Sequence, residues 1–204
     1  MKYLKEHRVL KGEDLNFLVM EGGYLNIQNK SLFVNWFMNN FPKFSLKHNA
    51  GGLIFKVPRE KPYPIICDID VDLSREVTLK EEVYVELAEM VLDEFTKLTG
   101  VTEHVEIVMS RRPEACYYKK AKRVWHAGFH LYILGRYTLQ QRVLLRENVL
   151  RNIDVKGFFT NVWGDSVLNS AEKIYDPALS KRSNGVLLLG CRKPNLKVGP
   201  HFIF

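Results

Sequence analysis

The segment from Pro64 to Leu73 constrains the fold most strongly, because it places acidic residues in a stretch with the pattern of a buried strand. Successive side chains of an extended strand point to opposite faces, so Asp68, Asp70 and Asp72 share one face. The Ile and Val residues between them take the other face, towards a core. Like charges this close repel, and burying them is costly unless cations or donors offset the charge. The acidic face is therefore either solvated or a site for a divalent metal ion, which prefers hard oxygen ligands.

The length and composition indicate a folded protein. A chain of 204 residues can bury a core as one domain or two small subdomains, and 46% hydrophobic residues exclude a disordered chain. Apolar runs such as Gly185 to Gly190 are too short to span a bilayer, and the charged start from Met1 to Lys11 lacks the apolar region of a signal peptide. We expect a protein of the cytosol or nucleus that is neither secreted nor bound to a membrane.

The charge balance indicates a class of partner. Lys and Arg total 30 against 23 Asp and Glu, and the formal net charge of +7 favours a polyanion such as nucleic acid.

Three cysteines, Cys67, Cys116 and Cys191, are widely spaced without a C-x-x-C pair. We expect free thiols and no structural zinc.

The first 50 residues predict a helical N-terminal part. Apolar side chains recur there at spacings of three and four: Leu15, Phe17 and Leu18, then Leu32, Phe33, Trp36, Phe37 and Phe41. Pro42 is expected to end the second helix. Residues 53–57 predict a short strand that we expect beside the acidic strand.

The rest of the chain alternates between strand and helix patterns. Thr78, with Glu81 three residues on, is expected to cap a helix that ends at Gly100. Strands are predicted at 105–110 and 125–134, followed by a helix at 138–152 with core positions Val143, Leu144, Val149 and Leu150. Short strands are predicted at Ile174–Asp176 and Val186–Leu189. The order strand, strand, helix, strand, strand, helix indicates an α+β fold with helices on one face of the sheet.

A basic run between two predicted strands is a candidate nucleic-acid contact. It should form an exposed loop or hairpin tip, where cations bind phosphates and aromatic rings stack on bases; a merely solvated loop is the alternative. The candidate residues are Arg111, Arg112, Tyr117, Tyr118, Lys119, Lys120, Lys122 and Arg123.

Two later positions carry further polar chemistry. His130 lies among apolar residues, and Gly128 leaves space on the same strand face. His126 is about 13 Å from His130 at four residues' rise, so the two do not form a zinc pair. Asp176 precedes Pro177, which alone indicates a turn. Basic residues beyond it bracket an apolar strand and can hold phosphates at both ends.

In this order, the motifs resemble those of archaeo-eukaryotic primases, above all the primase-polymerase branch of large DNA viruses, including the asfivirus-type primase fused to a helicase. The matching segments are Ile65–Asp70, Ala127–His130, Ile174–Asp176 and the ending Gly190–Lys193. The chain departs from the family pattern at three positions. Gly128 and Cys191 stand where serine is usual, and Leu187 stands where arginine is frequent.

The resemblance implies an RRM-like antiparallel sheet with flanking helices, in a single domain over residues 1–204 cut from a longer chain. Residues 1–50 would be the helical N-terminal part and residues 51–204 the catalytic sheet core. The implied activity is that of a DNA primase or primase-polymerase, which makes or extends primers by template-directed nucleotidyl transfer. The implied partners are single-stranded DNA template and primer, nucleoside triphosphates, and a helicase domain in the same chain or in trans. The implied location is the cytoplasm or nucleus of the host cell.

The resemblance also implies the roles of single residues. Asp68, Asp70 and Asp176 would hold two Mg²⁺ or Mn²⁺ ions. Asp72 would lie next to these ligands without contacting a metal ion. His130 would donate to a phosphate of the incoming nucleotide. Further nucleotide-binding residues would be Lys181, Arg182, Arg192 and Lys193. Two alternatives stay open: a two-metal nuclease, which needs no basic cradle after Asp176, and a non-catalytic nucleic-acid-binding module, which would present stacking aromatics in place of the acids.

Overall fold

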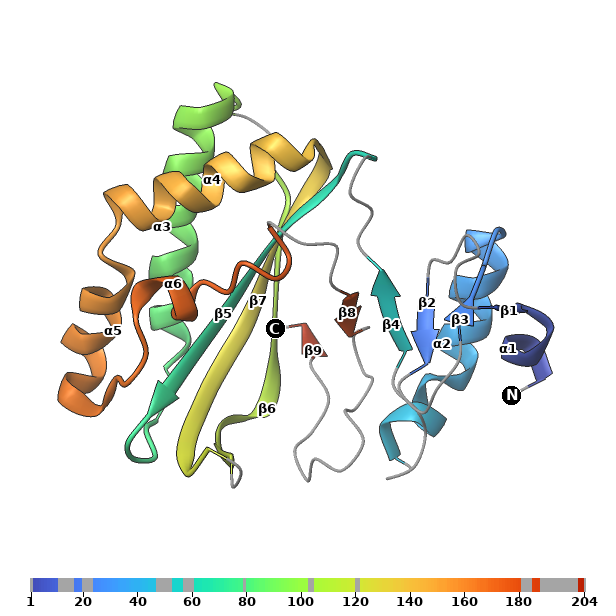
Figure 1. Ribbon diagram of the computed structural model, residues 1–204, viewed down its shortest axis with the longest axis horizontal. Helices are drawn as coiled ribbons and strands as arrows, with labels where there is room; N and C mark the ends of the chain where they lie inside the picture. The colour runs from blue at the N-terminus through green and yellow to red at the C-terminus, as the bar shows by residue number, and fades with distance from the viewer. Residues whose placement is uncertain are drawn as a thin grey trace.

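The computed structural model describes residues 2–10, 17–19, 24–46, 53–56, 61–78, 80–102, 105–119, 122–180, 185–187 and 202–203. Within these residues the chain forms two antiparallel sheets with flanking helices (Figure 1). The predicted α+β class is confirmed. None of the described helices is long and apolar enough to cross a membrane.

The main sheet carries the acidic strand. Its strand order is β5-β7-β6-β9, with bounds β5 (Tyr63–Leu73), β7 (Val124–Tyr137), β6 (Ile107–Lys119) and β9 (Phe202–Ile203). The acidic side chains of β5 are partly exposed, whereas Ile69 and Val71 are buried, so the predicted alternation is confirmed. This alternation leaves one face of the sheet for a core and the other for polar side chains.

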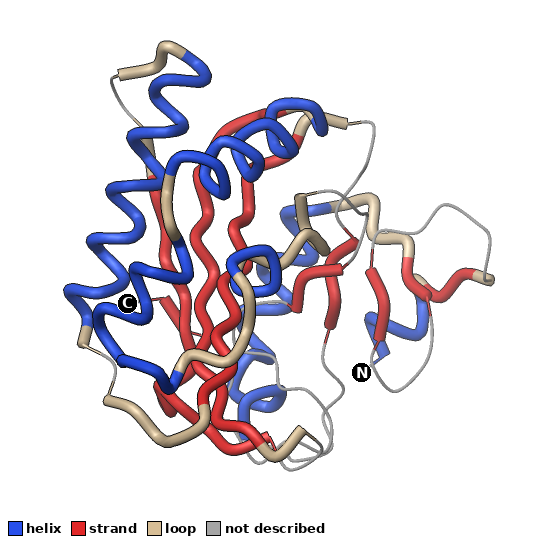
Figure 2. The backbone as a smooth tube through the Cα atoms, turned by 60° about the vertical axis from the view of Figure 1, so that its left-hand side comes forward, coloured by secondary structure: helices blue, strands red, loops and turns tan. Residues whose placement is uncertain are grey.

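Three helices cover the apolar face of the main sheet: α3 (Glu81–Thr99), α4 (Leu139–Asn152) and α5 (Val155–Trp163) (Figure 1; Figure 2). The core between sheet and helices includes Val71, Leu87, Phe129, Leu145 and Phe159, each at most 3% exposed. After α5 come a 3-10 turn, η1 (Gly164–Ser166), and the short α6 (Ala171–Ile174). Helices therefore lie on one face of the sheet, as the sequence predicts.

A smaller sheet has the order β1-β3-β2-β4-β8. Its elements are β1 (Arg8–Val9), β2 (Phe17–Val19), β3 (Tyr24–Leu25), β4 (Leu53–Lys56) and β8 (Gly185–Leu187), with α1 (Lys2–Glu6) and α2 (Lys30–Leu46). Leu25, Ile27, Phe33 and Leu53 form its core.

Several predictions for the N-terminal part are wrong. Residues 17–19 form a strand rather than a helix, because they pair with β3 and β4 along the sheet and this pairing outweighs a short local pattern. Helix α2 continues past Pro42 to Leu46, although proline removes one backbone donor and crowds the preceding turn. Strand β4 pairs with β2 and β8 and not with the acidic strand, so the two predicted neighbours belong to different sheets.

Two details of the helices also differ from prediction. The cap residue of α3 is Lys80 and not Thr78, and no side chain caps this end. In α4, Val149 is buried as predicted, but Leu144 is 37% exposed. Arg142 and Arg146 are buried there instead, because α4 turns its Arg146 side inward to backbone carbonyl groups.

Candidate metal centre

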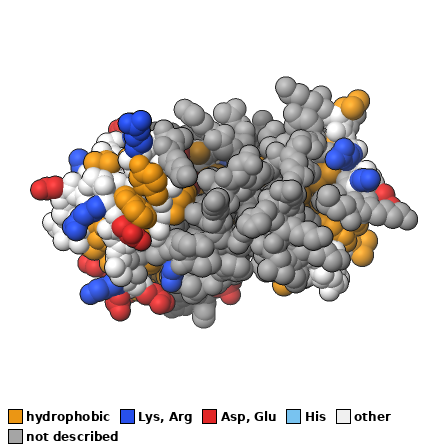
Figure 3. Space-filling model, turned by 90° about the horizontal axis from the view of Figure 1, so that it is seen from below, with side chains coloured by type: hydrophobic (Ala, Val, Ile, Leu, Met, Phe, Trp, Pro, Cys, Tyr) orange, Lys and Arg blue, Asp and Glu red, His pale blue; other side chains and the backbone are white. Residues whose placement is uncertain are grey.

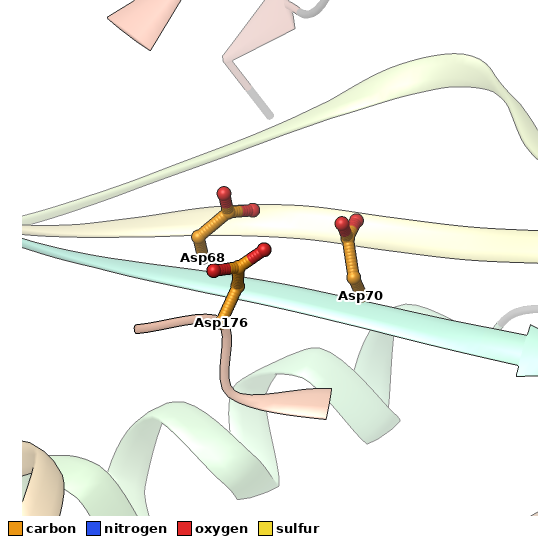
Figure 4. A group of neighbouring side chains, drawn as sticks. All are labelled: Asp68, Asp70 and Asp176. Carbon is orange, nitrogen blue, oxygen red and sulfur yellow. The ribbon is translucent and has the colours of Figure 1, made fainter. Parts of the chain in front are cut away.

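Three carboxylates that lie far apart in the sequence converge beside β5. Asp68 and Asp70 project from β5, and Asp176 follows α6 (Figure 4). One ligand oxygen from each lies within 4.8 Å of the others, and all three residues are partly exposed. Carboxylate oxygens are the hard ligands that Mg²⁺ and Mn²⁺ prefer. The donor set therefore fits a divalent metal ion, which would also offset the mutual repulsion of the three charges.

Backbone contacts along the free edge of β5 bring Asp176 to this place. The backbone N–H of Asp176 donates to the carbonyl oxygen of Asp68 at 2.9 Å. Upstream, the Asn169 side chain donates to the carbonyl of Asp70 at 2.7 Å and accepts from the N–H of Asp72 at 3.0 Å. The segment after η1 thus runs along the edge strand, and the third motif is an edge contact rather than the predicted strand.

Arg146 anchors the residue before Asp176. Its Nε and Nη2 atoms donate to the carbonyl of Tyr175 at 3.0 and 2.7 Å, and Nη2 donates to that of Glu172 at 2.9 Å. The Tyr175 hydroxyl donates to the Cys67 Sγ at 2.9 Å. Burial raises the pKa of the Cys67 thiol to about 12 and raises the pKa of Tyr175, so both groups stay neutral near pH 7. Tyr175 is therefore held at its backbone and at its ring.

His130 lies against the cluster, on the predicted face of β7. Its Nε2 is 3.3 Å from Oδ1 of Asp68, and its Nδ1 is 3.1 Å from the Tyr132 hydroxyl. Burial raises the pKa of Tyr132 to about 12, so the phenol keeps its proton near neutral pH. The structure therefore brings His130 together with the three carboxylates.

A second histidine, His126, contacts two acids of β5. Its Nε2 lies 2.9 Å from Oδ1 of Asp70, and its Nδ1 lies 2.8 Å from Oδ1 of Asp72. Burial opposes ionisation of Asp70, but the hydrogen bond to His126 and the charges of His126, Lys119 and His130 outweigh it, and the pKa of Asp70 lies well below its usual value. Asp70 is thus anionic at neutral pH.

Sequence reasoning considered His126 only as a zinc ligand and missed these contacts. The signal was present in the two strands, since the spacing of His126, Gly128 and His130 matches that of the three acids. The antiparallel register sets Asp68 opposite His130, Asp70 opposite Gly128 and Asp72 opposite His126. The space expected above Gly128 is in fact taken by Asp70 and His126.

The predicted nucleic-acid-binding residues do not form one loop. Most of the basic run belongs to β6, because the hairpin turn is short and the strand pairing extends to Lys119. A register shift between Arg111 and Cys116 interrupts the pairing. Arg111 lies 5.9 Å from the ring centre of Tyr84 in α3, on the helix-covered face. Tyr117 packs edge-on against His126 on the acidic face.

Two lysines of the run point into the site. Lys119 Nζ is 3.7 Å from Oδ1 of Asp72, and Lys122 Nζ is 3.3 Å from its Oδ2. Tyr118 and Arg123 are exposed. The side chains of Arg112 and Lys120, and residues Lys181, Arg182, Arg192 and Lys193, lie outside the described part of the chain.

A cavity of about 530 Å³ opens beside the carboxylates. Acidic and basic side chains line it together, among them Asp70, Asp176, Lys119, Lys122 and Lys173. Its size is within the range of small-molecule sites. Carboxylate oxygens and ammonium groups therefore share one polar cleft, which suits an anionic ligand that binds together with a cation.

Comparison with known protein families identifies the family of this chain. A family model described as "C962R protein N-terminal AEP domain" covers residues 16–199, which is most of the chain. AEP denotes archaeo-eukaryotic primase. A search of curated proteins found no significant match.

Proposed function

The chain belongs to this asfivirus-type family of archaeo-eukaryotic primase domains, and we propose that it is the catalytic domain of a DNA primase or primase-polymerase. Domains of this kind are generally nucleotidyltransferases. The observation that carries the proposal is the approach of three carboxylate oxygens to within 4.8 Å of one another. The resemblance in sequence assigns these three positions to the family's motifs. The reaction would be template-directed addition of nucleotides to a primer.

We assign Asp68, Asp70 and Asp176 as ligands of Mg²⁺ or Mn²⁺. When bound, such ions lower the pKa of an attacking 3′-hydroxyl and offset the charge of the leaving pyrophosphate. His130 would donate a hydrogen bond from its ring to a phosphate oxygen of the incoming nucleotide. The Tyr132 hydroxyl, 3.1 Å from His130 Nδ1, would hold the ring in that orientation.

The topology supports an RRM-like core. The chain order β5-α3-β6-β7-α4, with β7 between β5 and β6, is that of a split β-α-β unit. The segment after η1 takes the position beside β5. We propose that the nucleotide and primer end occupy the cleft on the acidic face, with Lys181, Arg182, Arg192 and Lys193 as phosphate contacts inferred from the sequence alone.

The test is primer synthesis and extension on a single-stranded template with labelled nucleotides and Mn²⁺. Wild type should make or lengthen products. Asp70→Asn removes a charged ligand and should lower the rate by about 100-fold or more, since even loss of a ligand's hydrogen-bond partner costs 10- to 100-fold, while DNA binding persists.

The control is Asp93→Asn, an exposed acid of α3, which should behave as wild type. Equal rates for wild type and Asp70→Asn would contradict the assignment of the site. Shortening of the labelled strand in place of extension would identify a nuclease.

A further inference from the structure

His126 has no role in the proposed reaction, yet it is among the most enclosed polar groups near the carboxylates. Its side chain is 6% exposed, whereas that of Asp70 is 39% exposed and that of Asp68 is 19% exposed. Asp70 is thus the more open of the two carboxylates of β5 in the cluster. The 2.9 Å contact with His126 Nε2 holds one of its oxygens.

The direction of this hydrogen bond follows from the partners of the ring. A carboxylate oxygen only accepts, so Nε2 carries a proton and donates to Asp70. Nδ1 lies 2.8 Å from Oδ1 of Asp72 and also 2.8 Å from Nζ of Lys119. Whether Nδ1 donates to Asp72 or accepts from Lys119, the Nε2–H remains directed at Asp70.

The ring itself is held in place from several sides. Asp72 stands directly opposite His126 in the strand register. The Tyr117 ring packs against it with centroids 5.2 Å apart, nearly edge-on. A donor fixed in this way can restrict the rotation of the carboxylate that it contacts.

Gly128 provides the room for this contact. It stands opposite Asp70, and a Cβ at this position would lie 2.7 Å from Asp70 Oδ1 and 3.3 Å from His126 Nε2. The first distance is shorter than real side chains tolerate. Any larger residue at position 128 would therefore displace Asp70 or separate it from His126.

We propose that His126 is a positioning residue of the metal centre, which holds Oδ1 of Asp70 through its Nε2–H and leaves the other oxygen of Asp70 for the metal ion. This inference rests on the proposed function in taking Asp70 as a metal ligand. Asp72 and Lys119 act through His126 by holding its ring, and Gly128 keeps the path between the two strands open.

The test separates the two ring nitrogens. His126→Gln keeps an N–H group near the position of Nε2, and His126→Asn keeps one near Nδ1. Mn²⁺ affinity, measured by calorimetry without nucleotide or DNA, should fall about 10- to 100-fold in His126→Asn and Gly128→Ala. It should stay within about threefold of wild type in His126→Gln, because the donor to Asp70 is retained. The control is His7→Asn, between α1 and β1, which should bind Mn²⁺ as wild type does.

Thermal melting of each variant distinguishes positioning from a purely structural role. Equal Mn²⁺ affinity in His126→Gln and His126→Asn, at any melting temperature, would overturn the inference. So would wild-type affinity in a folded Gly128→Ala. Failure of wild type to bind Mn²⁺ or extend a primer would instead overturn the proposed function.

Discussion

The acidic residues of β5 are distinguished by their partners. Asp72 is contacted by His126, Lys119 and Lys122, so the protein itself offsets its charge. Asp68 and Asp70 face histidine side chains and the carboxylate of Asp176. Asp72 therefore needs no metal ion to balance its charge, and it lies outside the cluster of Asp68, Asp70 and Asp176 although it shares the same strand face.

Arg146 is the residue whose loss should affect the third carboxylate most. Arg146→Met removes three charged hydrogen bonds to carbonyl groups of Tyr175 and Glu172. The free energy of unfolding should fall by about 2 to 3 kcal/mol, and Mn²⁺ affinity should fall as well, because Asp176 follows Tyr175. Urea denaturation and calorimetry measure the two effects.

The control for this change is Arg151→Met, in the exposed last turn of the same helix, which should alter stability by less than about 0.5 kcal/mol. If both variants denatured at the same urea concentration, Arg146 would not anchor the segment.

At the scale of helices, two similar sequence motifs have different outcomes. Thr138 and Gln141 form a capping box at the start of α4, in which the Thr138 hydroxyl accepts from the Gln141 N–H at 3.2 Å. Thr78 and Glu81 have the same spacing before α3, but the observed cap of that helix is Lys80, two residues after the predicted cap, and the helix begins at Glu81. A motif shows that a cap can form, and the packing of the helix decides where its first turn lies.

This difference can be measured. Thr138→Ala should lower the free energy of unfolding by about 1 kcal/mol, since it removes a side-chain cap. Thr78→Ala should change it by less than about 0.5 kcal/mol, because Thr78 is an exposed residue outside the helix. Urea denaturation of both variants provides the comparison, and a larger loss in Thr78→Ala would show that α3 starts earlier in solution.

At the scale of the whole molecule, the formal net charge of +7 favours binding to a polyanion. Seen from below, the described side chains show Lys and Arg interspersed with Asp and Glu (Figure 3). Among the described cations, Lys119, Lys122 and Lys173 line the cleft with the carboxylates, and Arg123 is exposed at the hairpin turn. The attraction of a nucleic-acid backbone should therefore depend on where the basic side chains lie on the surface as well as on the net charge.

The binding of single-stranded DNA should depend on salt in a predictable way. The logarithm of the association constant should fall linearly with the logarithm of salt concentration, with a slope of about −0.7 for each phosphate contact. The double variant Lys122→Gln/Arg123→Gln removes two cations and should make this slope shallower by up to about 1.4. Fluorescence anisotropy between about 50 and 200 mM salt measures the slope. Over this range a protein with at least six phosphate contacts loses about 10³-fold or more in affinity.

The control for the salt experiment is Lys156→Gln, an exposed residue of α5 on the helical side of the sheet, which should leave the slope unchanged. An unchanged slope in the double variant would show that the hairpin turn does not contact the phosphates of DNA.

Local sequence patterns correctly predicted those features of the fold that depend on residues close together in the chain. The alternation in β5 and β7 set which side chains share a face, and the helical spacing after Lys80 located α3. The pattern failed at Phe17–Val19, because three residues are too few to distinguish a strand from part of a helix. The meeting of Asp176 with Asp68 was expected only from the family resemblance, since no local rule links residues so far apart.

The sequence by itself thus determined the acidic face, the histidines on the matching face of β7, and the order of strands and helices from β5 to α4. Only the tertiary structure decided the register that sets Gly128 opposite Asp70 and His126 opposite Asp72, and the path that carries Asp176 along the edge of β5. The alternation of side chains along a single strand determines which of them share a face. Register and edge contacts instead depend on pairing between distant segments. The candidate metal centre depends on both, because Asp68 and Asp70 share a strand face and Asp176 reaches them through an edge contact.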